Sequence, residues 1–283
     1  MFFRGLLTQT SNIKIRMNRS TAATKSFRFL KTRALFVLIL LLAGVLRADN
    51  SAVIPAVRTD LTNWMALHEN YVAEAKKGGI DLLFVGDSIT ERWRQNGKEV
   101  WRQFYAPRHA ANFGISGDRT QHVLWRLEHG ELDGIKPKVV VLLIGTNNTR
   151  TGKNGKAPNT PPQIIEGVTA VVDCLRTNLP ESRILLLAIF PRGHTDAPER
   201  KPIAEVNRSI AGLDDGKQVK FLDIGGSFLE PDGTLSTNIM PDLLHLSPRG
   251  YQIWANAMEP TLAGMLGEQA DSGVKGPPAL PGQ

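Results

Sequence analysis

Five short apolar segments, separated by segments of helical periodicity, constrain the fold of this chain more than any other feature. The clearest segment is residues 139–144 (VVVLLI), in which no polar residue interrupts the run. Strands of this composition are buried on both faces, and they occur in parallel sheets that helices cover on both sides. The other four apolar segments are residues 80–85, 110–115, 184–190 and 219–224.

Helical patterns lie between these segments. In residues 61–77 apolar side chains recur every three or four positions, and two glycines follow. The last helix is predicted to begin after Ser247, a favourable N-cap, with Pro248 as its first residue. Further helical patterns cover residues 120–130, 163–178 and 199–213. The alternation predicts an α/β fold, a flavodoxin-like three-layer α/β/α sandwich with a five-stranded parallel sheet.

The positive charge of the chain is concentrated at its N-terminus. A formal net charge of +7 suggests nucleic acid or an anionic membrane as a partner. However, residues 1–33 hold eight Lys or Arg and no acidic residue, and an apolar run follows at residues 34–46. A basic stretch, a short apolar core and the small residue Ala48 form the pattern of a secretory signal peptide. The apolar run is also shorter than the about 20 residues that a membrane-spanning helix needs.

We therefore predict an exported protein, periplasmic or secreted, with an uncleaved signal anchor as the alternative. A cut after Ala48 removes nine of the 34 basic residues and leaves 25 beside 27 acidic ones, a net charge of −2. On this prediction nucleic acid is not a partner. The predicted organisation is a signal peptide at 1–48, one folded domain at 49–266 and a disordered Gly/Pro-rich tail at 267–283.

Distinctive polar residues follow the apolar segments. In open parallel sheets, ligands bind beyond the carboxyl ends of the strands. Ser88 follows the first segment in Gly-Asp-Ser and is a candidate nucleophile or a helix cap. Gly117 follows the second in Ser-Gly-Asp, where its N–H can approach a substrate or form an ordinary turn. Asn147 follows the third, and its amide can donate to an oxyanion or stabilise a turn.

A carboxylate and a histidine complete the set. Asp242 precedes His245 by three residues, a spacing at which the carboxylate can orient the imidazole ring. Alone, the spacing favours an exposed pair near a helix start. Together with Ser88, the pair supplies a nucleophile, a base and an orienting carboxylate at one edge of the predicted sheet. Gly117, Asn147 and the serine's own N–H add oxyanion donors, which completes the groups needed for acyl transfer.

These motifs, in this order, resemble the sequence blocks of the SGNH hydrolase superfamily, also called GDSL esterases. Within that superfamily the chain is similar to the catalytic subunits of the intracellular type of platelet-activating factor acetylhydrolase. The similarity covers about residues 60–266. The stretches that carry it are DLLFVGDSIT, NFGISGDRTQHVLWRLEHGEL, GTNN, PRG and DLLHLSPRGY.

The resemblance implies that residues 49–266 form an SGNH hydrolase domain. It implies a serine esterase that removes short acyl groups, typically acetyl, without a metal or cofactor. Ser88 would be the nucleophile, His245 the general base and acid, and Asp242 the residue that orients His245. The oxyanion hole would consist of the N–H groups of Ser88 and Gly117 and the side chain of Asn147. The expected substrate is a small-molecule, lipid or polysaccharide acyl ester, and the relatives' dimers make a homodimer an expectation.

Two other functions stay open from sequence. One is an acyltransferase, which would also pass through an acyl-Ser88 intermediate. The other is a non-catalytic carbohydrate-binding protein, although such a protein would be expected to have lost Ser88 or His245. The histidines show no metal-ligand spacing, and the single cysteine, Cys174, cannot form an intramolecular disulfide. The loop at residues 149–162 lies beside the predicted site and could reshape the acyl or leaving-group pocket.

Overall fold

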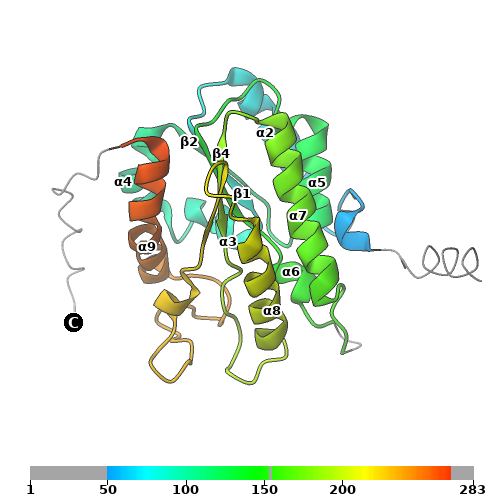
Figure 1. Cartoon of the computed structure of the whole chain (residues 1–283), viewed down its shortest axis with the longest axis vertical. Helices are drawn as coiled ribbons and strands as arrows, with labels where there is room; N and C mark the ends of the chain where they lie inside the picture. Colours follow the sequence, from blue (N-terminus) through cyan, green and yellow to red (C-terminus); the bar gives the residue numbers. More distant parts are fainter. Residues whose placement is uncertain (1–49, 153–154, 269–283) are drawn as a thin grey trace, which may run out of the picture. The chain divides into compact units, whose positions relative to one another are not determined.

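The computed structural model describes residues 50–152 and 155–268. Its strands form one parallel five-stranded sheet with the order β2-β1-β3-β4-β5, which confirms the predicted α/β fold (Figure 1). Each strand falls within, or one residue outside, one of the five apolar segments. The strands are β1 (Leu82–Gly86), β2 (Ala110–Gly114), β3 (Val139–Leu143), β4 (Arg183–Leu187) and β5 (Val219–Leu222).

Helices cover both faces of the sheet, so the domain has three layers, as Figure 1 shows for α7 on one side and α9 on the other. One layer contains α2 (Trp64–Lys77), α5 (Thr120–Arg126), α7 (Pro161–Asn178) and α8 (Arg200–Ile210). The opposite layer contains α3 (Ser88–Glu91), α4 (Lys98–Phe104) and α9 (Pro248–Leu266). The short helix α6 (Thr146–Thr149) follows β3.

The strands divide their side chains between the two layers. Val140 and Leu142 of β3 pack against the layer of α7, whereas Val139 and Val141 pack against the layer of α9. This two-residue alternation follows from the pleat of a strand. Because both faces are buried, the strand has no polar face, which explains its uninterrupted apolar sequence.

The structure differs from the predicted elements mainly in its short helices. Helices α3, α4 and α6 have four to seven residues, too few turns for a recognisable apolar period. The predicted helix 120–130 ends as α5 at Arg126 and continues as a π-helical turn. Single turns fill the remaining connections: η1 (Ser51–Val53), η2 (Arg92–Arg94), η3 (Ala106–Arg108), η4 (Leu127–Glu131), η5 (Ala211–Leu213) and η6 (Gly225–Phe228).

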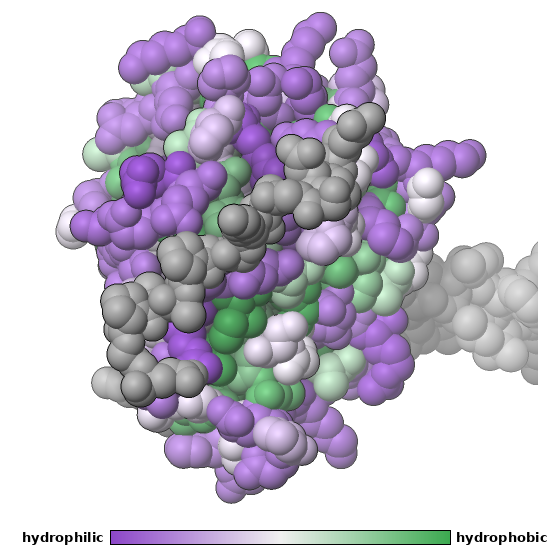
Figure 2. Space-filling view, turned by 90° about the vertical axis from the view of Figure 1, so that its left-hand side faces the viewer, coloured by the Kyte–Doolittle hydropathy of each residue, from purple (hydrophilic) through white to green (hydrophobic). Residues whose placement is uncertain are grey.

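The face that bears α4 and α9 is mostly hydrophilic around one hydrophobic area (Figure 2). Within the described ranges, no helix combines the length and the hydropathy needed to cross a bilayer. The predicted signal peptide at 1–48 and nearly all of the predicted tail lie outside the described residues.

Candidate active site

Ser88 lies at the turn between β1 and α3. Asp87 caps α3, because its Oδ1 accepts a hydrogen bond of 3.0 Å from the N–H of Ile89. Ser88 is therefore the first residue of the helix, and it is only 6% exposed. Gly86 makes the turn possible, since a Cβ at this position would lie 2.4 Å from the carbonyl oxygen of Leu143. The sequence thus places a serine at the carboxyl end of β1, an interior strand that pairs with β2 and β3.

The fold brings His245 and Asp242 to this serine across 157 residues of sequence. Ser88 Oγ and His245 Nε2 are 2.9 Å apart. On the other side of the ring, His245 Nδ1 is 2.6 Å from Asp242 Oδ2. Leu243 has a positive φ of 57°, so the chain turns sharply and returns the Asp242 carboxylate to the histidine. The three side chains form one continuous chain of hydrogen bonds.

The Asp242 carboxylate is held in its charged form. Burial alone would raise its pKa, but the hydrogen bonds from the His245 ring and backbone hold the pKa below its usual value. The backbone N–H of His245 donates to Asp242 Oδ1 at 2.7 Å. Asp242 therefore carries a negative charge at neutral pH and favours an N–H on the near nitrogen of the ring.

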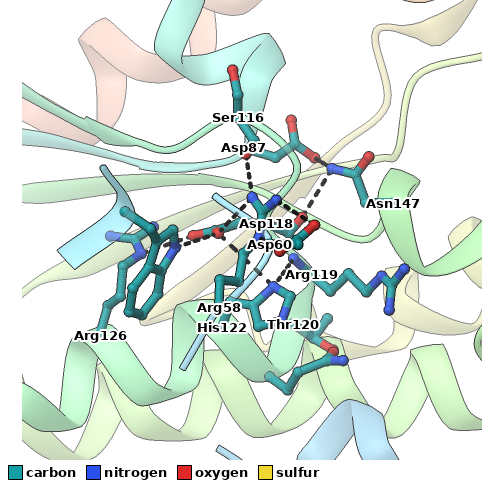
Figure 3. A network of polar contacts seen from close by, with 12 residues as sticks. Arg58, Asp60, Asp87, Ser116, Asp118, Arg119, Thr120, His122, Arg126 and Asn147 are labelled. Atoms are coloured by element: carbon teal, nitrogen blue, oxygen red, sulfur yellow. Dashed lines mark hydrogen bonds and ion pairs between the residues drawn. The ribbon is translucent and has the colours of Figure 1, made fainter. Parts of the chain in front are cut away.

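The structure places Gly117 and Asn147 close together, at the edge of the sheet where Ser88 lies. Gly117 lies in the loop after β2 with a φ of 80°, while Gly114 is the last residue of β2 itself. Asn147 lies in α6, and its Nδ2 donates to the carbonyl oxygen of Asp118 at 2.9 Å. A longer contact of 3.4 Å joins the same Nδ2 to Asp87 Oδ2 (Figure 3).

Two buried carboxyl groups adjoin these residues. Burial raises the pKa of Asp87 to about 7, against the hydrogen bond from Ile89, and the charge of Asp118 adds to the rise. Burial likewise raises the pKa of Asp118 to about 6, although the guanidinium of Arg126 opposes it. Asp87 belongs to the motif Gly-Asp-Ser and Asp118 to the motif Ser-Gly-Asp. The sequence alone does not reveal that both carboxyl groups are buried.

Two further charged residues hold the loop of Gly117, and sequence reasoning did not single them out. Glu91 Oε2 accepts a hydrogen bond of 2.7 Å from the N–H of Ser116. Arg58 donates from Nη1 to the carbonyl oxygen of Ser116. Arg58 lies in a segment without periodicity, and no motif includes it, so the sequence carries no signal for this contact.

Solved structures share the fold. A GDSL-like lipase from Bacteroides thetaiotaomicron matches with a TM-score of 0.56 and 17% identity, over 70% of this chain and 97% of that one. The acetylxylan esterase Axe2 from Geobacillus stearothermophilus matches with a TM-score of 0.53 and 22% identity, over 68% and 96% of the two chains. At these identities the likeness concerns the fold.

Curated relatives are much more similar in sequence. The platelet-activating factor acetylhydrolase IB subunit alpha2 of Rattus norvegicus is 41% identical over 207 residues, which are 72% of this chain and 86% of the relative. The human alpha1 subunit is 39% identical over 212 residues, 75% of this chain and 87% of the relative. The resemblance inferred from the motifs is confirmed.

These relatives contradict the predicted export to the periplasm or the medium. The subunits that the chain resembles belong to the intracellular type of acetylhydrolase, and that prediction is wrong. The prediction depended on composition: a basic N-terminus before a short apolar run. Such a pattern reports charge and hydropathy, and these properties alone do not determine a compartment.

The segment that matches a protein-family model contains the whole candidate active site. The model of the GDSL-like Lipase/Acylhydrolase family matches residues 84–253, a range that includes Ser88, Asn147 and His245. It also includes all five strands apart from the first two residues of β1. Sequence, fold and relatives therefore agree, and the chain belongs to the GDSL-like lipase/acylhydrolase family as a carboxylic ester hydrolase.

Proposed function

We propose that this esterase removes short acyl groups, acetyl above all, through an acyl-Ser88 intermediate. The observation that carries the proposal is the pair of hydrogen bonds that joins Ser88 to His245 at 2.9 Å and His245 to Asp242 at 2.6 Å. A nucleophile beside a base, with the base oriented by a third group, is the arrangement that activates a serine.

The proposed reaction has two halves. His245 Nε2 takes the proton of Ser88 Oγ while this oxygen bonds to the ester carbonyl carbon. The tetrahedral intermediate collapses, the bond to the alcohol oxygen breaks, and His245 gives its proton to the departing alcohol. A water molecule, deprotonated by His245, then attacks the acyl-serine and releases the carboxylic acid and the free Ser88 hydroxyl. Asp242 stabilises the imidazolium that forms in each half.

The N–H groups of Ser88 and Gly117 and the Asn147 amide are the proposed oxyanion donors. Asn147 Nδ2 already donates two hydrogen bonds. The contact with Asp87 is the longer one, at 3.4 Å, so it is the weaker of the two. We infer that the amide hydrogen now shared with Asp87 donates to the substrate oxyanion. The hydrogen bond to the Asp118 carbonyl keeps the amide in place.

The proposed acetyl preference is supported by the relatives, which are named acetylhydrolases and are about 40% identical to this chain. Neither a transferase nor a non-catalytic binding protein is favoured, since the matching family model is one of lipases and acylhydrolases.

Ser88→Ala tests the proposal on p-nitrophenyl acetate, butyrate and octanoate. We expect the variant to lose at least about a thousandfold in kcat on each ester, whereas Ser227→Ala, an exposed serine, serves as the matched control with unchanged turnover. For the wild type we expect kcat/KM to fall as the acyl chain lengthens. Wild-type turnover by a folded Ser88→Ala variant contradicts the mechanism. Equal kcat/KM for acetate and octanoate contradicts the acetyl preference alone.

A further inference from the structure

We propose that Arg58 is a positioning residue for the oxyanion hole, because it holds the peptide group whose N–H belongs to Gly117. This inference depends on the proposed role of the Gly117 N–H. Arg58 lies in the segment of residues 50–60, here called the N-terminal arm. The arm precedes α2 and lies outside the range of the family model.

One peptide unit joins Ser116 to Gly117. The carbonyl of Ser116 and the N–H of Gly117 belong to the same planar amide, and in a trans amide they point in opposite directions. Arg58 Nη1 donates to this carbonyl oxygen (Figure 3). A group that fixes the oxygen on one side therefore fixes the direction of the N–H on the other side. In the described part of the chain, the Gly117 N–H has no acceptor and is available to a ligand.

The neighbouring peptide groups are held by other residues. Glu91 accepts from the N–H of Ser116 at 2.7 Å, and Asn147 donates to the carbonyl of Asp118 at 2.9 Å. Among the described residues, only Arg58 hydrogen-bonds to the unit between Ser116 and Gly117. Gly117 has a φ of 80° and no side chain to restrain it, so this unit depends on Arg58 for its orientation.

Arg58 is itself held firmly. Its Nε and Nη2 bind the two carboxylate oxygens of Asp60 at 2.9 and 3.0 Å, and its Nη1 lies 3.6 Å from Asp118 Oδ1. The arm is fixed to α5, since the N–H of Ala56 donates to the carbonyl of Gln121 at 3.1 Å. A planar guanidinium bound on two edges keeps a defined orientation.

The guanidinium also packs directly against Gly117. A Cβ on this glycine would lie 2.8 Å from Arg58 Nη1, so the absence of a side chain lets the cation approach the loop. The Arg58 side chain is only 9% exposed, and its Nη1 already donates to the Ser116 carbonyl, so the proposed action on substrate runs through this peptide unit. Donation to the Ser116 carbonyl polarises the amide and strengthens the N–H as a donor, because hydrogen bonds in a chain reinforce one another.

Arg58→Met and its matched control Arg94→Met test the proposal in the full-length protein. Arg94 also donates to a backbone carbonyl, that of Asn112 in β2, but it does not bind the Ser116–Gly117 unit. The measurements are kcat and KM on p-nitrophenyl acetate, and the Ki of a methyl trifluoromethyl ketone, which forms an oxyanion adduct with an active serine. Arg58→Met should lower kcat about tenfold to a hundredfold, leave KM within about twofold and raise Ki by the same factor as kcat falls. Arg94→Met should change none of the three.

Arg58→Lys keeps the proposal testable if Arg58→Met does not fold. A lysine retains the positive charge and one donor but not the two-edged fork, so kcat should lie between those of the wild type and Arg58→Met. Wild-type kcat and Ki in a folded Arg58 variant overturn the proposal, and so does an equal loss in Arg94→Met. If Ser88→Ala is inactive in those experiments, the inference alone has failed. If Ser88→Ala is active, the proposed function has failed.

Discussion

At the scale of single residues, the members of the proposed triad differ most in their exposure to water. Ser88 is 6% exposed, whereas the side chain of Asp242 is 54% exposed and that of His245 15%. Water competes for the Asp242 carboxylate and screens its charge, so its interaction with the imidazolium is weaker than that of a buried carboxylate. His245 is the proposed proton carrier, and in the proposed mechanism no other group replaces it.

Replacing Asp242 by Asn should therefore cost less activity than removing His245. The asparagine can still hold the ring, but it lacks the charge that stabilises the imidazolium. We expect kcat of Asp242→Asn to be higher than kcat of His245→Ala by about tenfold or more. Steady-state kinetics on p-nitrophenyl acetate measure both, with the exposed Asp232→Asn as the control. Identical kcat values for Asp242→Asn and the wild type would refute the orienting role.

Asp87 should make the folded state less stable as the pH rises. Burial raises its pKa from 3.8 to about 7, so between these values the folded protein binds more protons than the unfolded chain. The free energy of unfolding contributed by this group is then highest at low pH and declines from about pH 4 to about pH 7. Asp87→Asn should remove the decline, measured as the difference in Tm between variant and wild type across this window.

The difference in Tm between Asp87→Asn and the wild type is the proper readout, because another group changes the stability with pH in the opposite direction. Burial lowers the pKa of His122 from 6.5 to about 3, so its contribution to stability rises with pH between these values. Since His122 is present in both proteins, it cancels in the comparison. Parallel Tm curves for Asp87→Asn and the wild type would show that Asp87 has no raised pKa.

At the scale of elements, a buried network of charges connects α2, α5 and β2. Arg126 of α5 is fully buried, and its Nε donates to Asp118 Oδ2 at 2.8 Å. It also binds Glu131 and the carbonyl oxygen of Phe113 at the end of β2. Glu131 in turn is 2.9 Å from His68 Nδ1 in α2. The loop that carries Gly117 is thus attached to the helical layer through Asp118.

Arg126→Met should destabilise the fold strongly. The methionine fills much of the space but leaves Asp118 and Glu131 buried without their cation, which costs about 3–5 kcal/mol when one partner of a buried ion pair is removed. Urea unfolding measures the effect. The control is Arg102→Met, which breaks a surface pair with Glu99 and should change the free energy of unfolding by less than about 1 kcal/mol. Equal stabilities of the two variants would contradict the structural role of the network.

The predictability of an element followed its length and burial. The strand β3 and the helix α7 repeat one chemical pattern over many residues, so the sequence reports them directly. The helix α3 has four residues, and only the capping carboxylate of Asp87 and the turn at Gly86 mark it. The π turn after α5 depends on Gly130, which adopts a φ of 103°, a backbone choice that helical periodicity does not predict.

At the scale of the whole molecule, every residue of the proposed site lies in the described part of the chain, which begins at Asn50. The N-terminal arm belongs to this unit. Asn50 Nδ2 donates to Glu166 Oε2 at 2.8 Å on α7, and Thr120 Oγ1 donates to the Ala52 carbonyl at 2.7 Å on α5. The domain boundaries at 49 and 266 stay a prediction, and so does the homodimer.

Two truncations test the lower boundary and the arm together. Removal of residues 1–49 should leave kcat on p-nitrophenyl acetate within about twofold, because it keeps Arg58, the anchor at Ala56 and the hydrogen bonds between Ser88, His245 and Asp242. Removal of residues 1–60 also deletes Arg58 and the anchors of the arm, and it should lower both kcat and Tm. Each truncated protein is compared with the full-length chain. A fully active protein without residues 1–60 would contradict the role of the arm.

The sequence by itself determined the α/β class, because burial on both faces of a strand leaves a continuous apolar run. It also identified Ser88, Gly117, Asn147, Asp242 and His245 as candidates, because parallel strands bring their carboxyl ends to one edge. Only the tertiary structure decided that Arg58 meets the Ser116 carbonyl across 58 residues, or that Asp87 is buried deeply enough to shift its pKa. Such contacts depend on how an aperiodic arm and several loops pack in space, and packing of that kind leaves no repeating pattern in the sequence.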